Sequence, residues 1–451
     1  MTSTELKNYL SAHPTSKVKI AFTDIDGILR GKYISTEKFL SILEKGTTFC
    51  DVVFGWDAAD VLYSQGKKTG WHTGFPDTPA QLDLSTFRQI PWENNLPFVL
   101  GDFLEHDGKP STVCPRQLLK KMIAEAQALH FTPIFAQEFE WFNFAETPDS
   151  AQEKQYKNLK PLSPGMFGYS ILRTTLNNPF FDDLFEHLKA FQVPIEGLHT
   201  ETGPGTYEAA ITHSGALEAA DRAVLFKTAV KEIAYKHQIM ATFMAKIDEN
   251  LPGCGGHVHQ SLWDAEGKTN LFYDAQDPYH LSKTAKHYLA GILHCLPHIL
   301  PMFAPTINSY KRLVEGAWAP TTLTWGLDNR TVALRVLSAG ASSARIETRV
   351  IGADVNPYLA IAACLGAGLY GIKHELDLQE PTTGNGYLDY SHGSIPHTLI
   401  DATKNMQQSE VANEIFGKEF VEHFTMTRTW EWQQHLKSVT DWEYKRYFEI
   451  I

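Results

Sequence analysis

Two glutamates, Glu138 and Glu140, lie two residues apart in the run 132–144, which is rich in aromatic and β-prone residues and predicts a strand. Alternate side chains of a strand share a face, so both carboxylates would point the same way, roughly 6–7 Å apart. Two like charges on one face of an apolar strand are costly unless a partner neutralises them. The spacing therefore indicates a bound cation, if the chain supplies further ligands.

Further carboxylates and imidazoles occur at spacings that could complete such a site. Glu201 and Glu208 flank a Gly-Pro-Gly turn that could fold them together. His257 and His259 alternate on another predicted strand, after glycines that permit close backbone approach. With Glu347 added to the four glutamates above, and one of the two histidines, the candidate ligands are five glutamates and one histidine. Such an oxygen-dominated set favours Mg²⁺ or Mn²⁺ over zinc, which prefers histidine and cysteine.

Arginines accompany these acids. Arg345, Glu347 and Arg349 would share one face of a strand. The planar guanidinium matches a phosphate or a carboxylate, so these arginines indicate an anionic ligand. Magnesium, arginines and glycine-rich loops together indicate phosphoryl transfer from a nucleotide.

Each group also has a purely structural interpretation. Taken alone, the Glu-x-Glu pair could be a solvated strand edge, the His-x-His pair a hydrogen-bonded structural pair, and the Arg-x-Glu-x-Arg run a cross-strand ladder of ion pairs. Because all of them occur in one stretch of the chain, a shared cleft is the better interpretation.

The chain matches neither of two other phosphate-related motifs. The Asp24-Ile-Asp26-Gly27 run is similar to the aspartate pair of haloacid-dehalogenase-type phosphatases, but Ile28 stands where that motif has Thr or Val, and no alternating helix–strand series follows. The chain contains no Gly-x-x-x-x-Gly-Lys-Ser/Thr run, so no P-loop is predicted.

Length and composition describe an ordinary globular protein. The 451 residues predict two domains, and the hydrophobic content of 43% and charged content of 20% are typical of a folded, water-soluble chain. The formal charge of −12 argues against nucleic acid or an anionic membrane as the main partner. Five scattered cysteines and a polar N-terminus predict a reduced, cytoplasmic protein. The most apolar predicted helix, 357–374, is too short to span a bilayer.

Hydrophobic periodicity predicts an α+β protein whose large domain has a mostly antiparallel sheet. A small mixed domain is expected over 1–109 and a larger domain over 110–451, with a linker near 107–110. Helices are expected over 1–12, 36–45, from Pro115, over 180–191, over 215–236 and from Pro357. Strands are expected over 18–23 and 28–34 as a hairpin, then over 132–144, 239–247, 257–262, 321–326, 331–337 and 345–351.

The order of these motifs resembles the glutamine synthetase family, type I branch, over essentially the whole chain. The stretches that carry the resemblance are Gly253-Cys-Gly-Gly-His-Val-His-Gln-Ser261, Asn308-Ser-Tyr-Lys-Arg-Leu-Val314, Asp328-Asn-Arg330, Arg345-Ile-Glu-Thr-Arg349, Asp354-Val-Asn-Pro-Tyr358, the hairpin 24–32 and the C-terminal run 439–448.

The resemblance implies a role for each matching residue. Glu140, Glu201 and Glu208 would bind the metal near the reacting carboxylate, and Glu138, His257 and Glu347 the metal on the nucleotide phosphates. His259 and Ser261 would contact the nucleotide, while Arg312, Arg349 and the loop at Gly253 would hold the amino-acid substrate. Arg330 and Arg345 would neutralise the transferring phosphoryl group.

The resemblance also implies a fold, a reaction and an assembly. A β-grasp-like N-terminal domain would precede the catalytic domain, and the chain would form a dodecamer of two stacked hexameric rings. The implied enzyme is an ATP- and Mg²⁺-dependent (or Mn²⁺-dependent) ligase that joins the γ-carboxylate of glutamate to ammonia or an amine through an acyl phosphate. The alternatives are a non-catalytic structural relative and a ligase that uses a different acid.

Three positions depart from the family pattern. Pro252 precedes Gly253 where the family has Asn, and Trp318 replaces a flap glutamate, the nearest acid being Glu315. Asp57 lies in a loop that replaces the family's Asp-Gly-Ser-Ser loop, and could act from a neighbouring subunit. An indole in place of a carboxylate makes the acceptor site more apolar, which predicts an alkyl amine as a better acceptor than ammonia. Alternatively, Trp318 only packs the flap and another acid serves.

Overall fold

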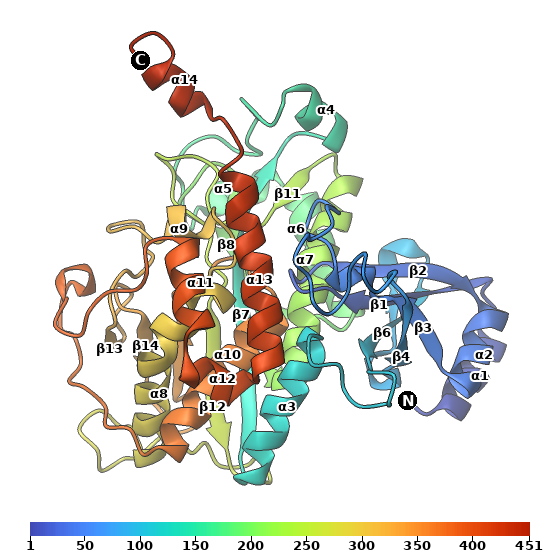
Figure 1. The fold of residues 1–451 in the computed structure, drawn as a ribbon, viewed down its shortest axis with the longest axis horizontal. Coiled ribbons are helices and arrows are strands. Elements are labelled where there is room, and N and C mark those ends of the chain that lie inside the picture. Colours follow the sequence, from blue (N-terminus) through green and yellow to red (C-terminus); the bar gives the residue numbers. More distant parts are fainter.

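The computed structural model describes residues 1–451 and contains two sheets (Figure 1). The N-terminal sheet has six strands in which β1 and β2 form a full hairpin, and the parallel pairing of β1 with β6 makes this sheet mixed. In spatial order its strands are β2 (Leu29–Ser35), β1 (Lys17–Thr23), β6 (Leu96–Phe103), β4 (Asp77–Leu82) and β3 (Thr47–Cys50), with β5 (Arg88–Ile90) beside β6.

Two helices cover one face of this sheet, α1 (Ser3–Ala12) and α2 (Thr36–Lys45). Leu6 and Leu10 of α1 and Phe39 of α2 pack on the apolar residues of β1 and β6, such as Phe22 and Phe103, in a small core of their own. The predicted hairpin and both predicted helices are therefore confirmed, each within a residue or two of the expected ends.

The larger sheet has nine strands and is built around the long strand β7, which pairs with β9, β10, β11 and β12. Every pairing in it is antiparallel except that of β13 with β14, so this sheet is also mixed. Its strands are β7 (Thr132–Phe144), β8 (Ile195–Thr200), β9 (Thr206–Ile211), β10 (Ser214–Gly215), β11 (Met240–Thr242), β12 (Val258–Trp263), β13 (Trp325–Leu327), β14 (Leu334–Leu337) and β15 (Arg345–Thr348).

Helices pack against this sheet and on one another. The helices are α3 (Pro115–Ala128), α4 (Pro148–Glu153), α5 (Ile171–Leu176), α6 (Asn178–Ala190), α7 (Ala216–Lys236), α8 (Lys283–Ile299), α9 (Ser309–Arg312), α10 (Pro357–Lys373), α11 (Leu399–Gln407), α12 (Glu410–Phe416), α13 (Lys418–His435) and α14 (Asp441–Tyr447). Single 3-10 turns occur at 51–54, 84–86, 91–93, 300–302 and 386–388.

Helix α10 lies at the centre of the main core, because almost all of its side chains are buried among α3, α7 and α8. Its uniform hydrophobicity, noted in the sequence, thus reflects burial in protein. None of the helices is both long enough and apolar enough to cross a lipid bilayer.

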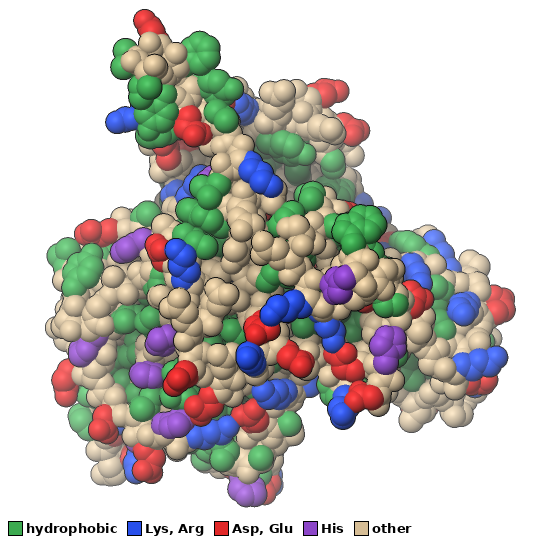
Figure 2. All heavy atoms as spheres, in the orientation of Figure 1, with side chains coloured by type: hydrophobic (Ala, Val, Ile, Leu, Met, Phe, Trp, Pro, Cys, Tyr) green, Lys and Arg blue, Asp and Glu red, His purple; other side chains and the backbone are tan.

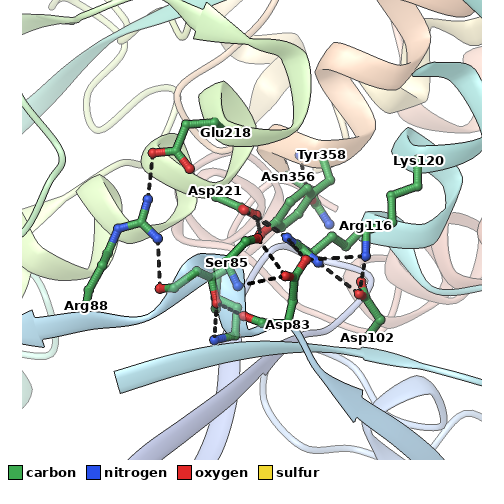
Figure 3. Close-up of polar contacts among 12 residues, drawn as sticks. Asp83, Ser85, Arg88, Asp102, Arg116, Lys120, Glu218, Asp221, Asn356 and Tyr358 are labelled. Atoms are coloured by element: carbon green, nitrogen blue, oxygen red, sulfur yellow. Dashed lines mark hydrogen bonds and ion pairs between the residues drawn. The ribbon is translucent and has the colours of Figure 1, made fainter. Parts of the chain in front are cut away.

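A buried ionic cluster joins the N-terminal sheet to the rest of the chain (Figure 3). Arg116, at the start of α3, donates to Asp102 of β6 at 2.8 Å and to both oxygens of Asp221 on α7 at 2.8 and 2.9 Å. It also reaches Asp83 at 2.9 Å, while Tyr358 donates to Asp221 at 2.6 Å. One guanidinium therefore ties together three regions that lie far apart in the sequence.

Several predicted strands are shorter than expected because other groups satisfy their backbone. The strand predicted over 239–247 ends at Thr242, and the backbone N–H and C=O of Lys246 bond to the side chain of Asn308. The strand predicted over 321–326 starts only at Trp325, because Leu323 pairs with Gly393. The strands predicted over 331–337 and 345–351 keep only residues 334–337 and 345–348.

Candidate active site

The two glutamates of β7 face a third acid across the sheet. Glu140 lies directly opposite Glu208 of β9, and Glu138 lies two residues further along the same face. Glu201 follows the end of β8 and is held to β9 by its backbone N–H, which donates to Thr206 at 2.8 Å. The turn between β8 and β9 needs Gly205, which has a φ of +67° and would place a Cβ 2.4 Å from the Asn143 carbonyl. All four carboxylates therefore gather at one end of a hairpin.

The two histidines reach the same place from the other side of β7. The Nδ1 atom of His257 lies 3.0 Å from one oxygen of Glu138 and 3.4 Å from an oxygen of Glu347. His259 of β12 lies directly opposite Glu347 of β15, and its Nε2 is 3.4 Å from the other oxygen of Glu138. Strand alternation thus puts Glu138, His257, His259 and Glu347 in one contiguous group, as the spacing predicted.

These side chains line one cavity of about 610 Å³. Its wall holds the four carboxylates and both histidines already described, with Glu347 fully buried behind them. The other lining residues are Arg312, Arg330, Arg335, Arg345, Arg349, Tyr169, Thr202, Thr206, Pro252, Gly253, Ala317 and Trp318. Acidic, basic and imidazole side chains therefore line a single cavity.

Burial and the neighbouring charges shift the pKa values of these acids. Burial, together with the neighbouring carboxylates, raises the pKa of Glu208 to about 10. Burial also opposes ionisation of Glu138, but His259 and His257 outweigh it and hold the pKa of this carboxyl well below its usual range. The pKa of Glu347 is lowered too, because the positive charges near it outweigh the cost of its burial. Without a cation, one acid of this group must keep a proton.

The donor atoms fit divalent ions. Two groups have donor atoms within 4.8 Å of one another: Glu138 with His259 and Glu347, and His199 with Glu201 and Glu208. The majority of oxygen donors matches the preference of Mg²⁺ and Mn²⁺. In these tight groups His259 stands where His257 was expected and His199 where Glu140 was expected. Glu140 instead accepts a hydrogen bond from the Gly255 backbone at 2.7 Å.

The arginines are held in place by carbonyl and carboxylate oxygens. Arg312, almost fully buried, donates to the carbonyls of Val350 at 3.0 Å and Arg349 at 3.1 Å. Arg349 is bonded to Glu347 and donates to the Arg330 carbonyl at 3.1 Å. These contacts leave little rotational freedom, so the positive side of the cavity is preorganised.

Glycines let the backbone approach these arginines. A Cβ on Gly253 would lie 2.8 Å from Arg312 and 2.5 Å from the Ala245 carbonyl. A Cβ on Gly255 would lie 2.5 Å from a ring nitrogen of His257. The glycine-rich run before β12 is therefore required by packing.

A second hollow, of about 280 Å³, adjoins the first and shares Glu138, His259 and Arg345 with it. Ser261 and the apolar Phe135, Ile211 and Trp263 are also part of its wall. Arg345 donates to His259 at 3.2 Å, between the two hollows. The larger hollow is thus lined mainly by charged side chains, whereas the smaller one mixes polar and apolar side chains.

Besides the buried Glu347, two predicted residues, Asp57 and Glu315, do not line either hollow. Asp57 accepts hydrogen bonds from the backbone of Ala59 and Val61 and from the indole of Trp430 at 2.9 Å. Its carboxylate is therefore occupied within its own chain. Glu315 is exposed and does not line the cavity that Trp318 and Ala317 line.

Sequence reasoning missed several residues of the site. Arg335 of β14 lies opposite Glu347 and donates to it at 2.9 Å, a position that strand alternation could have revealed. His199 contacts Glu201 at 3.1 Å and stacks on Tyr169, whose ring centroid is 4.4 Å away. Tyr169 lies in an irregular loop with a φ of +55°, and no sequence period would have indicated it.

Comparisons with known proteins agree with this geometry. Residues 112–447 match the family described as glutamine synthetase, catalytic domain. The chain is 53% identical to a type-1 glutamine synthetase 2 of Dictyostelium discoideum, over 98% of this chain and 86% of that one. It is 37% identical to a glutamate–isopropylamine ligase of a Pseudomonas species, over 99% and 98% of the two chains.

Another relative, a γ-glutamylethanolamide synthetase of Streptomyces coelicolor, is 35% identical over 99% of this chain and 95% of its own. Among solved structures, that of GmaS in complex with ADP matches with a TM-score of 0.86 at 26% identity, over 98% of this chain and 99% of the other.

Proposed function

The chain belongs to the glutamine synthetase family, and we propose that it joins the γ-carboxylate of L-glutamate to a primary amine through a γ-glutamyl phosphate formed with ATP. The observation that carries this proposal is the gathering of carboxylates, histidines and five arginines around one cavity. A non-catalytic relative would be expected to lose some of these residues, and this chain retains them all.

The first half of the reaction needs an electrophilic carboxyl group. A carboxylate resists attack by an amine because oxide is a poor leaving group, so an oxygen of the glutamate γ-carboxylate attacks the γ-phosphorus of ATP and ADP departs. The mixed anhydride that results carries phosphate as its leaving group. Bound Mg²⁺ or Mn²⁺ would supply the charge neutralisation that this phosphoryl transfer requires.

The residues of the chain have distinct roles in that step. We assign Arg312 and Arg349 to the substrate carboxylates, since both are anchored and directed at the cavity. Arg330, Arg345 and the newly found Arg335 lie where they can stabilise negative charge on the transferring group. His259 and Ser261 would contact the nucleotide in the adjoining hollow.

Metal binding is assigned to the acids and histidines. Glu140, Glu201 and Glu208 would hold one ion and Glu138, His257 and Glu347 the other, with His199 and His259 within reach of the same donors. The high pKa of Glu208 supports this assignment, because a cation would replace the proton that the acid cluster otherwise keeps.

The acceptor side of the cavity supports an alkyl amine. Pro252 and Trp318 form part of its wall, and no flap carboxylate is available there because Glu315 lies outside the lining. An ammonium ion gains most from a negative site, whereas an alkyl amine also gains from contact with an indole. Relatives that act on isopropylamine and ethanolamine support the same preference.

An assay of phosphate release tests the proposal directly. The wild-type protein, with ATP, Mg²⁺ and glutamate, is expected to release phosphate only when an amine is added. The highest kcat/KM is expected for a small alkyl amine, among ammonia, methylamine, isopropylamine, ethanolamine and putrescine. Binding of ATP without phosphate release for any acceptor would identify a non-catalytic relative. The highest kcat/KM with ammonia would refute the amine preference alone.

Two variants isolate the role of Trp318. Trp318→Phe keeps an apolar ring and should keep the amine preference, whereas Trp318→Glu restores a flap carboxylate and should raise the relative kcat/KM for ammonia at least about tenfold, or ~1.4 kcal/mol. Both replacements share the same backbone strain at φ +57°, so the comparison reports the side chain. Equal acceptor profiles would show that Trp318 only packs the flap.

Further features remain proposals that follow from the family. We propose a β-grasp-like domain over 1–109, a catalytic domain over 110–451, and a cytoplasmic dodecamer of two hexameric rings. Asp57 would then contribute to the site of a neighbouring subunit after release from Trp430. Size-exclusion chromatography with light scattering tests the assembly.

A further inference from the structure

Two histidines lie near the C-terminal end of α8, away from the carboxylate cavity. His294 is exposed and His298 is half-buried, and they are four residues apart, so both project from one face of the helix. Their ring centroids are 6.3 Å apart. Histidine side chains gather on this face of the molecule, over the region of α8 (Figure 2).

Neither ring is hydrogen-bonded to the protein, although the ring of His294 stacks on that of Tyr370, with centroids 5.8 Å apart. The neighbouring His287 is bonded to the Leu376 carbonyl at 2.8 Å, and His374 on α10 is bonded to Glu414 at 2.9 Å. No such bond holds His294 or His298, so their nitrogen lone pairs are free to bind a ligand. The contrast distinguishes this pair from the hydrogen-bonded histidines elsewhere on α8 and at the end of α10.

The spacing suits chelation of one ion. An ion bound at about 2.0–2.1 Å from each nitrogen in tetrahedral geometry would bring two imidazole centroids to roughly 5 Å. The two ring centroids therefore need to approach each other by only about 1 Å, which side-chain rotation can provide without movement of the helix backbone. Histidines at i and i+4 of a helix are a recurrent pair of zinc ligands.

Groups near the two histidines could supply further metal ligands, and the helix dipole favours a cation there. His294 also lines a cavity of about 360 Å³, together with Leu293, Asp377 and His392. Pro297 lies inside α8 and has no N–H to donate to the Leu293 carbonyl, which leaves that oxygen without its usual helical partner. The C-terminal end of a helix is also the negative end of its dipole, which favours a cation.

We propose that His294 and His298 chelate a divalent transition-metal ion, namely Zn²⁺, Ni²⁺ or Cu²⁺, with water and the groups of the adjoining cavity completing the coordination. Nitrogen donors select these ions over Mg²⁺, so the site differs in chemistry from the oxygen-rich catalytic cavity. The proposed metal site does not depend on which reaction the chain catalyses.

Anomalous diffraction is the direct test. The full-length protein, stripped of metal and then crystallised with Zn²⁺ in excess Mg²⁺, is expected to give an anomalous peak at the zinc edge within about 2.0–2.1 Å of nitrogens of both His294 and His298. Absence of a peak between these rings would overturn the proposal, whatever zinc is found in the catalytic cavity.

Titration of the protein with Zn²⁺ gives an independent measurement. His294→Ala and His298→Ala should each weaken one class of site at least about tenfold, since a chelate then keeps only one of its two nitrogens. The control His397→Ala removes an exposed histidine outside the cavity lining and should change nothing. Identical stoichiometry and affinity in all four proteins would refute the site. Phosphate release measured in Mg²⁺ alone should be unchanged in these variants.

Discussion

Replacing Arg116 by methionine should destabilise the fold, because it leaves buried carboxylates without their shared cation (Figure 3). Arg116 and Asp221 are each only 2% exposed, and Asp102 is 4% exposed. The replacement removes four bonds of 2.8–2.9 Å at once. Methionine has a similar length and no charge, so the change tests electrostatics more than packing.

The magnitude follows from what remains around each acid. Asp83 and Asp102 keep Lys120, while Asp221 keeps only the hydroxyl of Tyr358. Removing one partner of a buried ion pair costs about 3–5 kcal/mol. Since two of the three acids stay partly compensated, we expect a loss of about 3 kcal/mol in the free energy of unfolding, dominated by Asp221.

Urea unfolding, followed by tryptophan fluorescence and circular dichroism, measures this loss. The matched control is Lys7→Met, which breaks the exposed Lys7–Glu44 pair and should cost far less than the Arg116 replacement, because solvent screens an exposed pair. The double replacement Arg116→Met with Asp221→Asn removes the orphaned charge and should recover part of the loss. If Arg116→Met is no less stable than Lys7→Met, the cluster does not contribute as its geometry indicates.

Three further predictions follow from other parts of the molecule. Glu347→Gln should lower the rate of phosphate release more than about a hundredfold in protein that circular dichroism shows to be folded; unchanged turnover would remove Glu347 from the site. Burial lowers the pKa of Lys227 to about 7 from 10.5. Between these two pH values the unfolded chain binds more protons than the folded one, so the free energy of unfolding should rise with pH across this range. Lys227→Met should abolish the rise, and a pH profile equal to that of wild type would contradict it. Treatment with EDTA should abolish turnover, Mg²⁺ should restore it, and activity that survives chelation would exclude a metal-dependent reaction.

Short-range patterns allowed much of the site to be predicted from the sequence. Glu138, Glu140, His257, His259 and Glu347 follow the two-residue period of strands, so their common face was predictable. Their gathering around one cavity agrees with that prediction, whereas the role of each residue stays a prediction.

Other features depend on contacts that no local pattern encodes. Tyr169 reaches the cavity from an irregular loop, and the early end of the strand at 240–242 depends on the side chain of Asn308, which lies more than sixty residues further along. Helices α8, α11, α12 and α13 were not predicted individually, although their packing encloses the main core. Hydrogen bonds from residues distant in the sequence satisfy the backbone groups there, and a local pattern cannot reveal them.

The site glutamates lie on strands, whereas other residues of the cavity wall lie outside the sheet, and this arrangement bears on how the site can evolve. Glu138, Glu140, Glu208 and Glu347 are fixed in the hydrogen-bond ladder of the larger sheet, whereas Pro252 and Trp318 belong to segments outside it. Point changes in those segments can therefore reshape the proposed acceptor side of the cavity while the carboxylates in the sheet keep their positions.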